Sequence, residues 1–453
     1  NRRTAGRSPM PSIKDYFVAA GGKFPALVDT PEGSHQSEIG KASVFAGFLG
    51  DAPRRMKDGN GFEATFFWFP DDEDDRLAYA SGASWYDSRQ GKEHRAAEWR
   101  LYYGRGNPVM AKASPGDLCI VALKPDRTLA VIISPAGSTT AAQLARLFDI
   151  ETPDPLGDAA TLAALTTTLD AFSRWLLEEL NISVAAETTG QLDAMLKKFG
   201  GGLPDTASMS AFARQTAKGI DALADPDQAL VGWFDWEDKL FRELESVVVG
   251  EEVKPHLFEA SGRVNVEALT EFFLGVHNRR KSRAGHAFAH HIRAVFAANA
   301  VLFQSEVNTE NSKKLDFMLP NGFLYRRQGV PQGLLTALGA KTTCKDRWRQ
   351  VLSEAHQIPD KHLITLESNI SGKQLDEMAA ERLRLVIPKP RHWVFQSQHP
   401  GNDPLTVADF LALAKGREGD LRQNHGPDLD WSIQQLAAKM KPKPKRKPRS
   451  PKP

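Results

Sequence analysis

Short apolar runs separated by polar turns dominate the first 155 residues. Residues 61–70 are rich in Phe and Trp, and residues 116–124 and 128–134 are almost continuously apolar between Gly, Pro and Asp. Apolar runs of this length, bounded by turn residues, favour strands, and irregular connections between them predict a small barrel or sandwich. The pattern therefore predicts a β-rich N-terminal domain, closed by a helix over residues 141–148.

Longer runs with a helical period follow. Residues 158–180 are rich in Ala, Thr and Leu and predict a helix, and residues 199–204 read Phe-Gly-Gly-Gly-Leu-Pro, a strong breaker at which we place a domain boundary. Asp225 can cap a further helix that extends to about Val247. Two more amphipathic segments, 265–276 and 285–299, predict helices with a basic turn between them.

Strands and helices alternate beyond residue 300. Asp316 interrupts a short apolar strand, and Lys341 opens a β-branched run. The remaining predicted elements are a helix over 346–356, a strand over 361–367, a helix over 374–382, a strand over 383–388 and a helix over 403–415. This alternation predicts an α/β domain with a mixed central sheet flanked by helices.

Composition limits the function classes. The chain has 453 residues with 41% hydrophobic and 25% charged, which suits two or three globular domains. Its net charge is +2, so binding to a polyanion has to come from local clusters of basic residues. Only two cysteines are present, which disfavours a disulfide framework and suits a reducing cytoplasm. No apolar run is long enough to span a membrane, and no signal peptide is predicted.

Basic and aromatic residues interleave between the predicted N-terminal strands. Arginines can bind phosphates or guanine, and aromatic rings can pack on sugar or base, so this stretch suits DNA contact. The alternative is a solvated loop beside an aromatic-packed strand. The candidates for DNA contact are Arg89, Lys92, Arg95, Arg100, Tyr103 and Arg105, with His35 as a further loop candidate.

A second basic cluster precedes the predicted helix over residues 285–299. Arg280, Lys281 and Arg283 belong to this cluster and suit a phosphate backbone, and a solvated basic turn is the equal alternative. Farther on, Asp316 and Glu354 are carboxylates that can hold a hard divalent cation such as Mg²⁺. Lys341 can then stabilise charge on a phosphodiester. Many α/β proteins offer such a set, so the spacing alone leaves the chemistry open.

The motifs of the C-terminal half resemble the catalytic domain of EcoRII-type restriction endonucleases. The resemblance spans about residues 204–415 and lies in residues 279–285, 314–317, 341–350 and 354–355. It implies a restriction-endonuclease-like fold of the PD-(D/E)XK class. It also implies that Asp316 and Glu354 bind Mg²⁺, that Lys341 is the catalytic lysine, and that the protein is a homodimer that hydrolyses double-stranded DNA in a prokaryotic cytoplasm.

Lys345, Asp346 and Arg347 form a candidate base-reading run. Arg347 can bind guanine O6 and N7, and Asp346 can accept from cytosine N4. The alternative is a helix-capping Asp flanked by solvated basic residues. The family resemblance implies a short, near-palindromic C/G-rich site of the CC-x-GG type.

The N-terminal motifs resemble the effector domain of the same family. They are residues 33–36, the Tyr-Asp-Ser-Arg run that starts at Tyr86, and the Gly-Arg-Gly-Asn-Pro run that starts at Gly104. The resemblance implies a B3-like pseudobarrel that binds a second copy of the DNA site. It further implies that this domain shields the catalytic cleft until DNA is bound.

One position departs from the family pattern. The family carries an active-site glutamate on the helix after Arg-Ala-Gly, and its place falls on Ala289 here. Because alanine cannot hold a cation, a second hypothesis is a sequence-specific DNA-binding protein that is catalytically impaired.

The predicted organisation has five parts. A disordered leader covers 1–12, the effector domain 13–155, a helical connector with the glycine hinge 156–203, and the catalytic and dimerisation domain 204–418. An extension over 419–453 ends in eight basic residues without an acid after residue 438. Such a tail cannot pack and suits non-specific DNA affinity.

Overall fold

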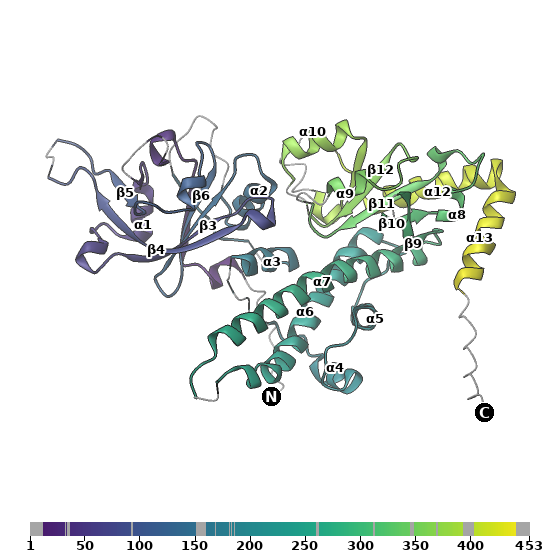
Figure 1. Cartoon of the computed structure of the whole chain (residues 1–453), viewed down its shortest axis with the longest axis horizontal. Coiled ribbons are helices and arrows are strands. Elements are labelled where there is room, and N and C mark those ends of the chain that lie inside the picture. Colours follow the sequence, from purple (N-terminus) through teal and green to yellow (C-terminus); the bar gives the residue numbers. More distant parts are fainter. Residues whose placement is uncertain are drawn as a thin grey trace, which may run out of the picture.

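The structure is a computed structural model. It describes residues 12–31, 33, 37–91, 94–150, 160–167, 169–180, 182, 184, 186–259, 262–310, 313–344, 348–367, 370–392 and 403–440. Figure 1 shows a β-rich N-terminal part on one side, an α/β C-terminal part on the other, and long helices beneath them. Within these residues, no helix is long and apolar enough to cross a membrane.

The N-terminal part is one curved sheet of eight strands in the order β2-β5-β4-β3-β7-β6-β1-β8. Its pairs are antiparallel except for β3 and β7. The strands are β1 (Ala19–Lys23), β2 (Glu38–Ile39), β3 (Phe62–Trp68), β4 (Leu77–Asp87), β5 (Trp99–Tyr102), β6 (Leu118–Leu123), β7 (Leu129–Ser134) and β8 (Thr161–Leu162). The predicted β-rich domain is therefore confirmed.

Strands β6 and β7 are buried along their whole length because both faces of the sheet are covered. Val121 and Val131 point into one apolar cluster, whereas Ile120 and Ile132 point into the other. The second cluster includes α2 (Thr139–Leu147) and α3 (Ala171–Glu179). Cover on both faces explains why these strands are continuously apolar rather than alternating.

The predicted helix over residues 158–180 is wrong. Residues 161–162 instead pair with β1 as strand β8, and the helix begins only after Asp170, whose side chain accepts from the backbone N–H of Ser173. Pairing with an existing sheet edge overrode the helix propensity of the Ala- and Leu-rich sequence.

The helical region continues with α4 (Leu192–Phe199), α5 (Thr206–Thr216), α6 (Pro226–Glu252) and α7 (Val266–Ala298). The predicted turn between two helices at residues 277–284 is wrong, because α7 runs through it as one helix of 33 residues. No proline interrupts this stretch, and the basic side chains find acidic partners on neighbouring helices, so the helix has no reason to end there.

The C-terminal part contains a five-stranded mixed sheet in the order β13-β12-β11-β10-β9. Its strands are β9 (Gln304–Asn308), β10 (Lys314–Leu319), β11 (Thr336–Lys341), β12 (Lys361–Thr365) and β13 (Leu383–Val386). Strands β9 to β11 are antiparallel, and β11 to β13 are parallel. The predicted α/β domain with a mixed central sheet flanked by helices is confirmed.

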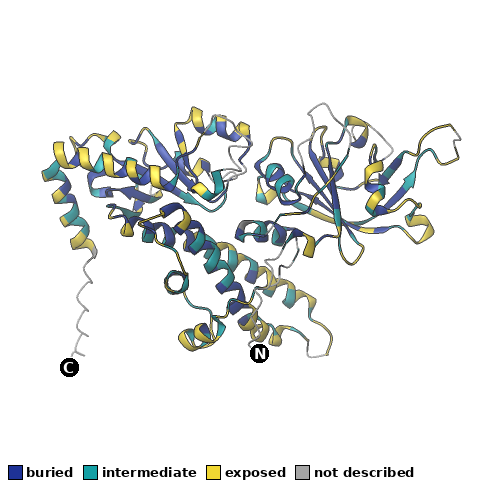
Figure 2. Cartoon of the chain, turned by 180° about the vertical axis from the view of Figure 1, so that it is seen from behind, coloured by how far each residue is buried: buried dark blue, intermediate teal, exposed yellow. Residues whose placement is uncertain are grey.

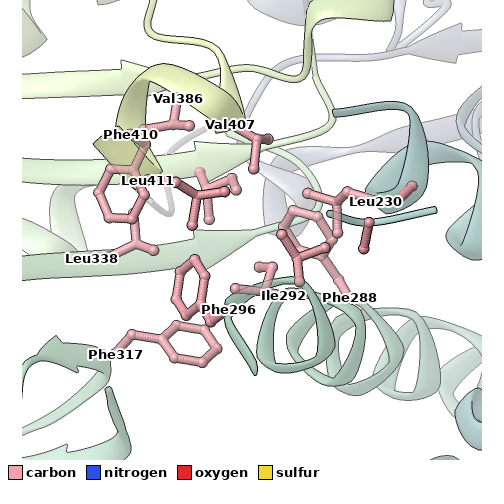
Figure 3. Close-up of a cluster of buried hydrophobic side chains, with 14 of the residues drawn as sticks. Leu230, Phe288, Ile292, Phe296, Phe317, Leu338, Val386, Val407, Phe410 and Leu411 are labelled. Carbon is pink, nitrogen blue, oxygen red and sulfur yellow. The ribbon is translucent and has the colours of Figure 1, made fainter. Parts of the chain in front are cut away.

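One of the buried clusters beside this sheet is rich in aromatic side chains and joins the sheet to its covering helices. Phe296 of α7 lies at its centre, with ring centroids 5.6 Å from Phe317 of β10 and 6.0 Å from Phe410 of α12 (Val407–Asn424). Figure 3 shows this cluster between α7, the sheet and α12, and Figure 2 shows that the strands of both sheets are largely buried. The core fixes α7 against the sheet that carries Asp316.

The remaining helices are α1 (Ala46–Leu49), α8 (Gly322–Tyr325), α9 (Trp348–Leu352), α10 (Gly372–Ala380) and α13 (Gly426–Met440). The predicted boundary at residue 418 falls inside α12. Helix α13 packs on α8, and the Asn321 side-chain amide donates to the Ser432 hydroxyl at 2.9 Å. The basic residues after 440 lie outside the described part of the chain.

Candidate active site

Asp316 lies where strands β10 and β11 separate. Their ladder ends at the pair Phe317 and Leu338, three residues before Lys341 at the end of β11. Beyond it, the Asp316 Oδ2 accepts from the backbone N–H of Ala340 at 2.8 Å and from Lys341 Nζ at 3.1 Å. The Asp316 side chain is 34% exposed, so it is held by two donors and remains accessible.

Lys341 ends a strand rather than opening one. It is the last residue of β11 and pairs in register with Thr365 of β12, while Thr342 and Thr343 lie in the following turn. The β-branched threonines misled the prediction, because the strand is instead formed by the apolar run before them. Its position at the strand end turns the Lys341 ammonium toward Asp316.

Glu354 lies in a bend just after α9, which is shorter than the predicted helix over residues 346–356. Its side chain is 9% exposed, and its Oε2 has no hydrogen-bond partner among the residues that the structure describes. Burial, together with the negative charge of Asp316, raises the pKa of Glu354 to about 7, although the charge of Lys341 acts in the opposite direction. The charges of Asp316 and Lys341 therefore both act on Glu354.

These residues fit a divalent cation. A buried carboxylate oxygen without a partner is costly unless a cation or a donor meets it. Asp316 and Glu354 would hold Mg²⁺ through their oxygens, the ligand type that this ion prefers. Among the residues that the structure describes, no group of three or more acids, histidines and cysteines converges as a metal site.

Ala289 lies on α7 and packs with its methyl group against the core of the C-terminal part. A methyl group supplies no ligand, so α7 contributes no carboxylate at this position. The observation is consistent with the departure from the family pattern that the sequence indicates.

The basic cluster on α7 is paired with acids. Arg280 contacts Glu245 at 2.5 Å and Glu178 at 2.6 Å, and Lys281 pairs with Glu73 of the N-terminal part and lies 3.8 Å from Glu179. These cations therefore already have anionic partners in this structure.

Arg283 is likewise engaged within the protein. It donates to the Pro204 carbonyl at 2.6 Å, and its guanidinium lies 4.3 Å from the centre of the Phe241 ring.

A cavity lies between this cluster and the two threonines that follow Lys341. Glu73 and Gln143 of the N-terminal part line it together with Lys281, and Thr342 and Thr343, which follow Lys341, line its other side. Nearby, the Gln374 side chain of α10 donates to Asp71 at 3.0 Å and accepts from the Thr139 hydroxyl at 2.5 Å. The N-terminal part thus packs directly beside the strand end that carries the lysine.

The candidates in the N-terminal part differ in accessibility. Arg95 and Arg105 are exposed, whereas Arg89 pairs with Glu98 at 2.6 Å, and Arg100 pairs with both Glu98 and Glu38. Burial argues against the predicted DNA contact of Tyr103, which is 1% exposed and donates its hydroxyl to the Asp29 carbonyl. Side chains alternate between the two faces along β5 and the residues that follow it, so the Tyr103 side chain points into the core.

Several predicted residues lie outside the described part of the chain. They are His35 and Lys92 of the N-terminal part and the whole base-reading run of Lys345, Asp346 and Arg347.

Sequence reasoning missed Arg55 and Glu73. The Arg55 guanidinium lies 5.2 Å from the centre of the Tyr86 ring, beside the candidate Arg100. The two adjacent arginines, Arg54 and Arg55, were a signal in the sequence that could have identified Arg55. Nothing near Glu73 in sequence indicates its contact with Lys281, because that contact joins residues 208 positions apart.

Comparisons with known proteins assign the C-terminal part. The family described as EcoRII C terminal matches residues 241–411. The type II restriction enzyme EcoRII of Escherichia coli is 33% identical over 198 residues, which cover 44% of this chain and 47% of the relative. The match thus spans about half the length of that curated relative.

Two solved structures are also similar, at TM-scores too low to add to the assignment. Metal-depleted Ecl18kI in complex with uncleaved, modified DNA overlays with a TM-score of 0.40 at 15% identity, covering 51% of this chain and 84% of that one. The PspGI–substrate DNA complex overlays with a TM-score of 0.40 at 12% identity, covering 48% and 94%. On the sequence matches, residues 241–411 of this chain belong to the C-terminal domain family of EcoRII-type restriction endonucleases.

Proposed function

We propose that this protein is a type II restriction endonuclease that hydrolyses phosphodiester bonds in double-stranded DNA with the help of Mg²⁺. The single observation that carries the proposal is the convergence of Asp316, Lys341 and Glu354 at the open end of β10 and β11. The EcoRII match over the same residues supports it.

The residues have distinct roles in this proposal. Asp316 and Glu354 hold the cation, which neutralises the phosphate and activates a water when bound. The backbone N–H of Ala340 fixes the Asp316 carboxylate, so that the acid is in place before substrate arrives. Lys341 is 3.1 Å from Asp316 and within reach of a phosphate beside it, where its charge stabilises the pentacoordinate transition state.

The substrate is proposed to be a C/G-rich near-palindrome of the CC-x-GG type, read by a homodimer. Lys345, Asp346 and Arg347 would contact the bases, and Arg280, Lys281 and Arg283 would contact the phosphates. Adjacent donor and acceptor side chains suit consecutive G·C pairs. A dimer with a two-fold axis suits a palindrome because each subunit meets one half-site.

The N-terminal part is proposed to be a B3-like effector domain that binds a second copy of the site and shields the cleft. The contact of Lys281 with Glu73 supports the shielding role, as does the cavity that Glu73 shares with Thr342. Deleting residues 1–203 is then expected to raise the cleavage rate. A truncated protein that folds and cuts no faster than the full chain would contradict shielding.

A specific observation favours a second candidate, a sequence-specific DNA-binding protein that does not cut. Ala289 supplies no carboxylate, and the described residues contain no convergent group of three metal ligands. The alternative retains the DNA-binding roles and omits hydrolysis.

Digestion of a multi-site plasmid with Mg²⁺ distinguishes the two. Cleavage by the unmodified chain supports the endonuclease, and sequencing of the ends identifies the site. Absence of cleavage by the unmodified chain and by Ala289→Glu supports the binding protein. Rescue by Ala289→Glu would show a scaffold that lacks one acid, and cleavage by Asp316→Ala would refute the assigned site.

A further inference from the structure

Glu306 of β9 and Asp316 of β10 lie on neighbouring strands. The antiparallel register pairs Leu315 with Val307 and Phe317 with Ser305, so Asp316 and Glu306 lie between the same two pairs on neighbouring strands. Glu306 contacts Lys314 Nζ, and Lys314 is two residues before Asp316 on β10. Glu306 is thus an acid on the strand next to the proposed metal ligand.

The backbone of Glu306 is strained. Its φ is +56°, the left-handed region that residues other than glycine rarely adopt, although it lies within a strand. Such a conformation persists only where the surrounding structure enforces it, often at functional sites. The strain singles out this position on β9.

Charged residues on the face of α7 that carries Ala289 act electrostatically on Glu306. A hydrogen bond from Lys314 is the main cause that lowers the pKa of the Glu306 carboxyl, and the charges of Arg293 and His286 of α7 also lower it. His286, Ala289 and Arg293 are spaced by three and four residues, so they share one face of the helix. Two charged side chains on the face of α7 that carries Ala289 therefore act on the Glu306 carboxylate.

An independent observation points to a cation at this place. Glu354 is more than nine-tenths buried, and its Oε2 has no partner in the described structure, while its charge interacts with that of Asp316. A carboxylate oxygen in that position is satisfied by a cation held between the two acids.

We propose that Glu306 is the third acid of the site and that it binds the divalent cation from β9, in place of the carboxylate that Ala289 lacks on α7. The inference rests on the proposed function, since it concerns the same cation. In this structure the Glu306 carboxylate is turned to Lys314 at 3.0 Å and the side chain is 57% exposed. An exposed ion pair of this kind is weak, so an arriving cation can draw the carboxylate away.

A titration with Mn²⁺ alone, followed by the electron paramagnetic resonance of the free ion, tests the proposal on the full chain at pH 8. Glu306→Gln keeps the shape of the side chain and removes its charge, and we expect it to weaken Mn²⁺ binding by about 10-fold or more. Glu306→Asp is expected to retain most of the binding. Glu271→Gln, which changes an exposed acid near the start of α7, is the matched control and is expected to bind as the unmodified chain does.

A double variant tests the replacement itself. If Glu306 replaces the missing acid, the double variant Glu306→Gln with Ala289→Glu is expected to regain Mn²⁺ affinity to within about 3-fold of the unmodified chain. The variants are expected to rank in the same order in Mg²⁺-dependent cleavage as in Mn²⁺ affinity. A double variant that binds no better than Glu306→Gln alone contradicts the replacement.

Asp316→Ala in the same titration separates this inference from the proposed function. Loss of Mn²⁺ by Asp316→Ala with full binding by Glu306→Gln overturns the role of Glu306 and leaves the proposed site intact. Unchanged binding by both variants, or no binding by the unmodified chain, overturns both.

Discussion

Replacing Glu354 by glutamine is expected to stabilise the metal-free protein at alkaline pH while abolishing cleavage. The carboxyl is 9% exposed, and burial, with the charge of Asp316, raises its pKa from 4.5 to about 7. The folded protein therefore binds a proton more tightly than the unfolded chain. Folding stability falls as pH rises from about 4.5 to 7, because over this range the folded state must give up a proton that the unfolded state has already lost.

The size of the effect follows from the same two values. The gap between 4.5 and about 7 corresponds to about 3 kcal/mol at ~1.4 kcal/mol for each step of one in pKa. Glutamine keeps the shape and removes the charge, so Glu354→Gln regains this free energy fully above pH 7 and not at all below pH 4.5. For a domain of this size the gain corresponds to a rise in Tm of roughly 6–12 °C.

Scanning calorimetry of the metal-free protein at pH 4.5 and pH 8 measures the effect, with Glu271→Gln as the control for loss of one exposed acid. Added Mg²⁺ is expected to raise the Tm of the unmodified chain at pH 8 and not that of Glu354→Gln, since a ligand stabilises only the state that binds it. An equal Tm for Glu354→Gln and the unmodified chain at pH 8 would refute the reasoning.

Three further predictions follow from the structure. Lys341→Met should abolish plasmid cleavage while leaving DNA affinity in a gel-shift assay within about 3-fold, and a variant that cuts at the original rate would exclude Lys341 from catalysis. Glu73→Gln removes the partner of Lys281 and should raise the cleavage rate by up to about 5-fold, the worth of one partly exposed ion pair; an unchanged or slower rate speaks against shielding. Phe296→Ala should lower the free energy of unfolding by about 3–5 kcal/mol in urea denaturation, and a loss below 1 kcal/mol would contradict its central place in the core.

Local patterns predicted the elements whose burial is uniform. Strands β6 and β7 are apolar throughout because apolar clusters cover both faces of the sheet. A continuous apolar run between turn residues is the sequence pattern that such burial produces. Asp225 likewise caps α6 as predicted, with its side chain accepting from the backbone N–H of Gln228. These features depend on residues within a few positions of one another.

Features that depend on distant partners were not predictable in the same way. Residues 277–284 have the composition of a basic turn, but acids on α3, α6 and η5 (Glu73–Asp75) neutralise them, and the helix continues. Residues 161–162 became a strand because β1 offered an unpaired edge. In both cases a tertiary contact outweighed a local preference of well under 1 kcal/mol per residue.

The candidate site shows the same division. Asp316 was visible as an acid within an apolar strand, and Lys341 and Glu354 were visible through the family motif. Glu306 carries no sequence signal, because its relation to Asp316 exists only through the register of β9 and β10 and its left-handed backbone. The metal-binding role proposed for it can therefore be argued only once the strands are paired.

Arg280 and Lys281 connect the two proposed activities, because they cannot serve DNA and protein at once. Both are candidates for phosphate contact, and both now pair with acids of the connector and the N-terminal part. If DNA takes these cations, Glu178 and Glu73 must release them, so DNA binding and the docking of the N-terminal part oppose each other. Such opposition is reciprocal: DNA weakens the docking of the N-terminal part by the same factor as docking weakens DNA binding. Competition between DNA and the acidic side chains for Arg280 and Lys281 would then be enough to explain the proposed shielding, without a further conformational device.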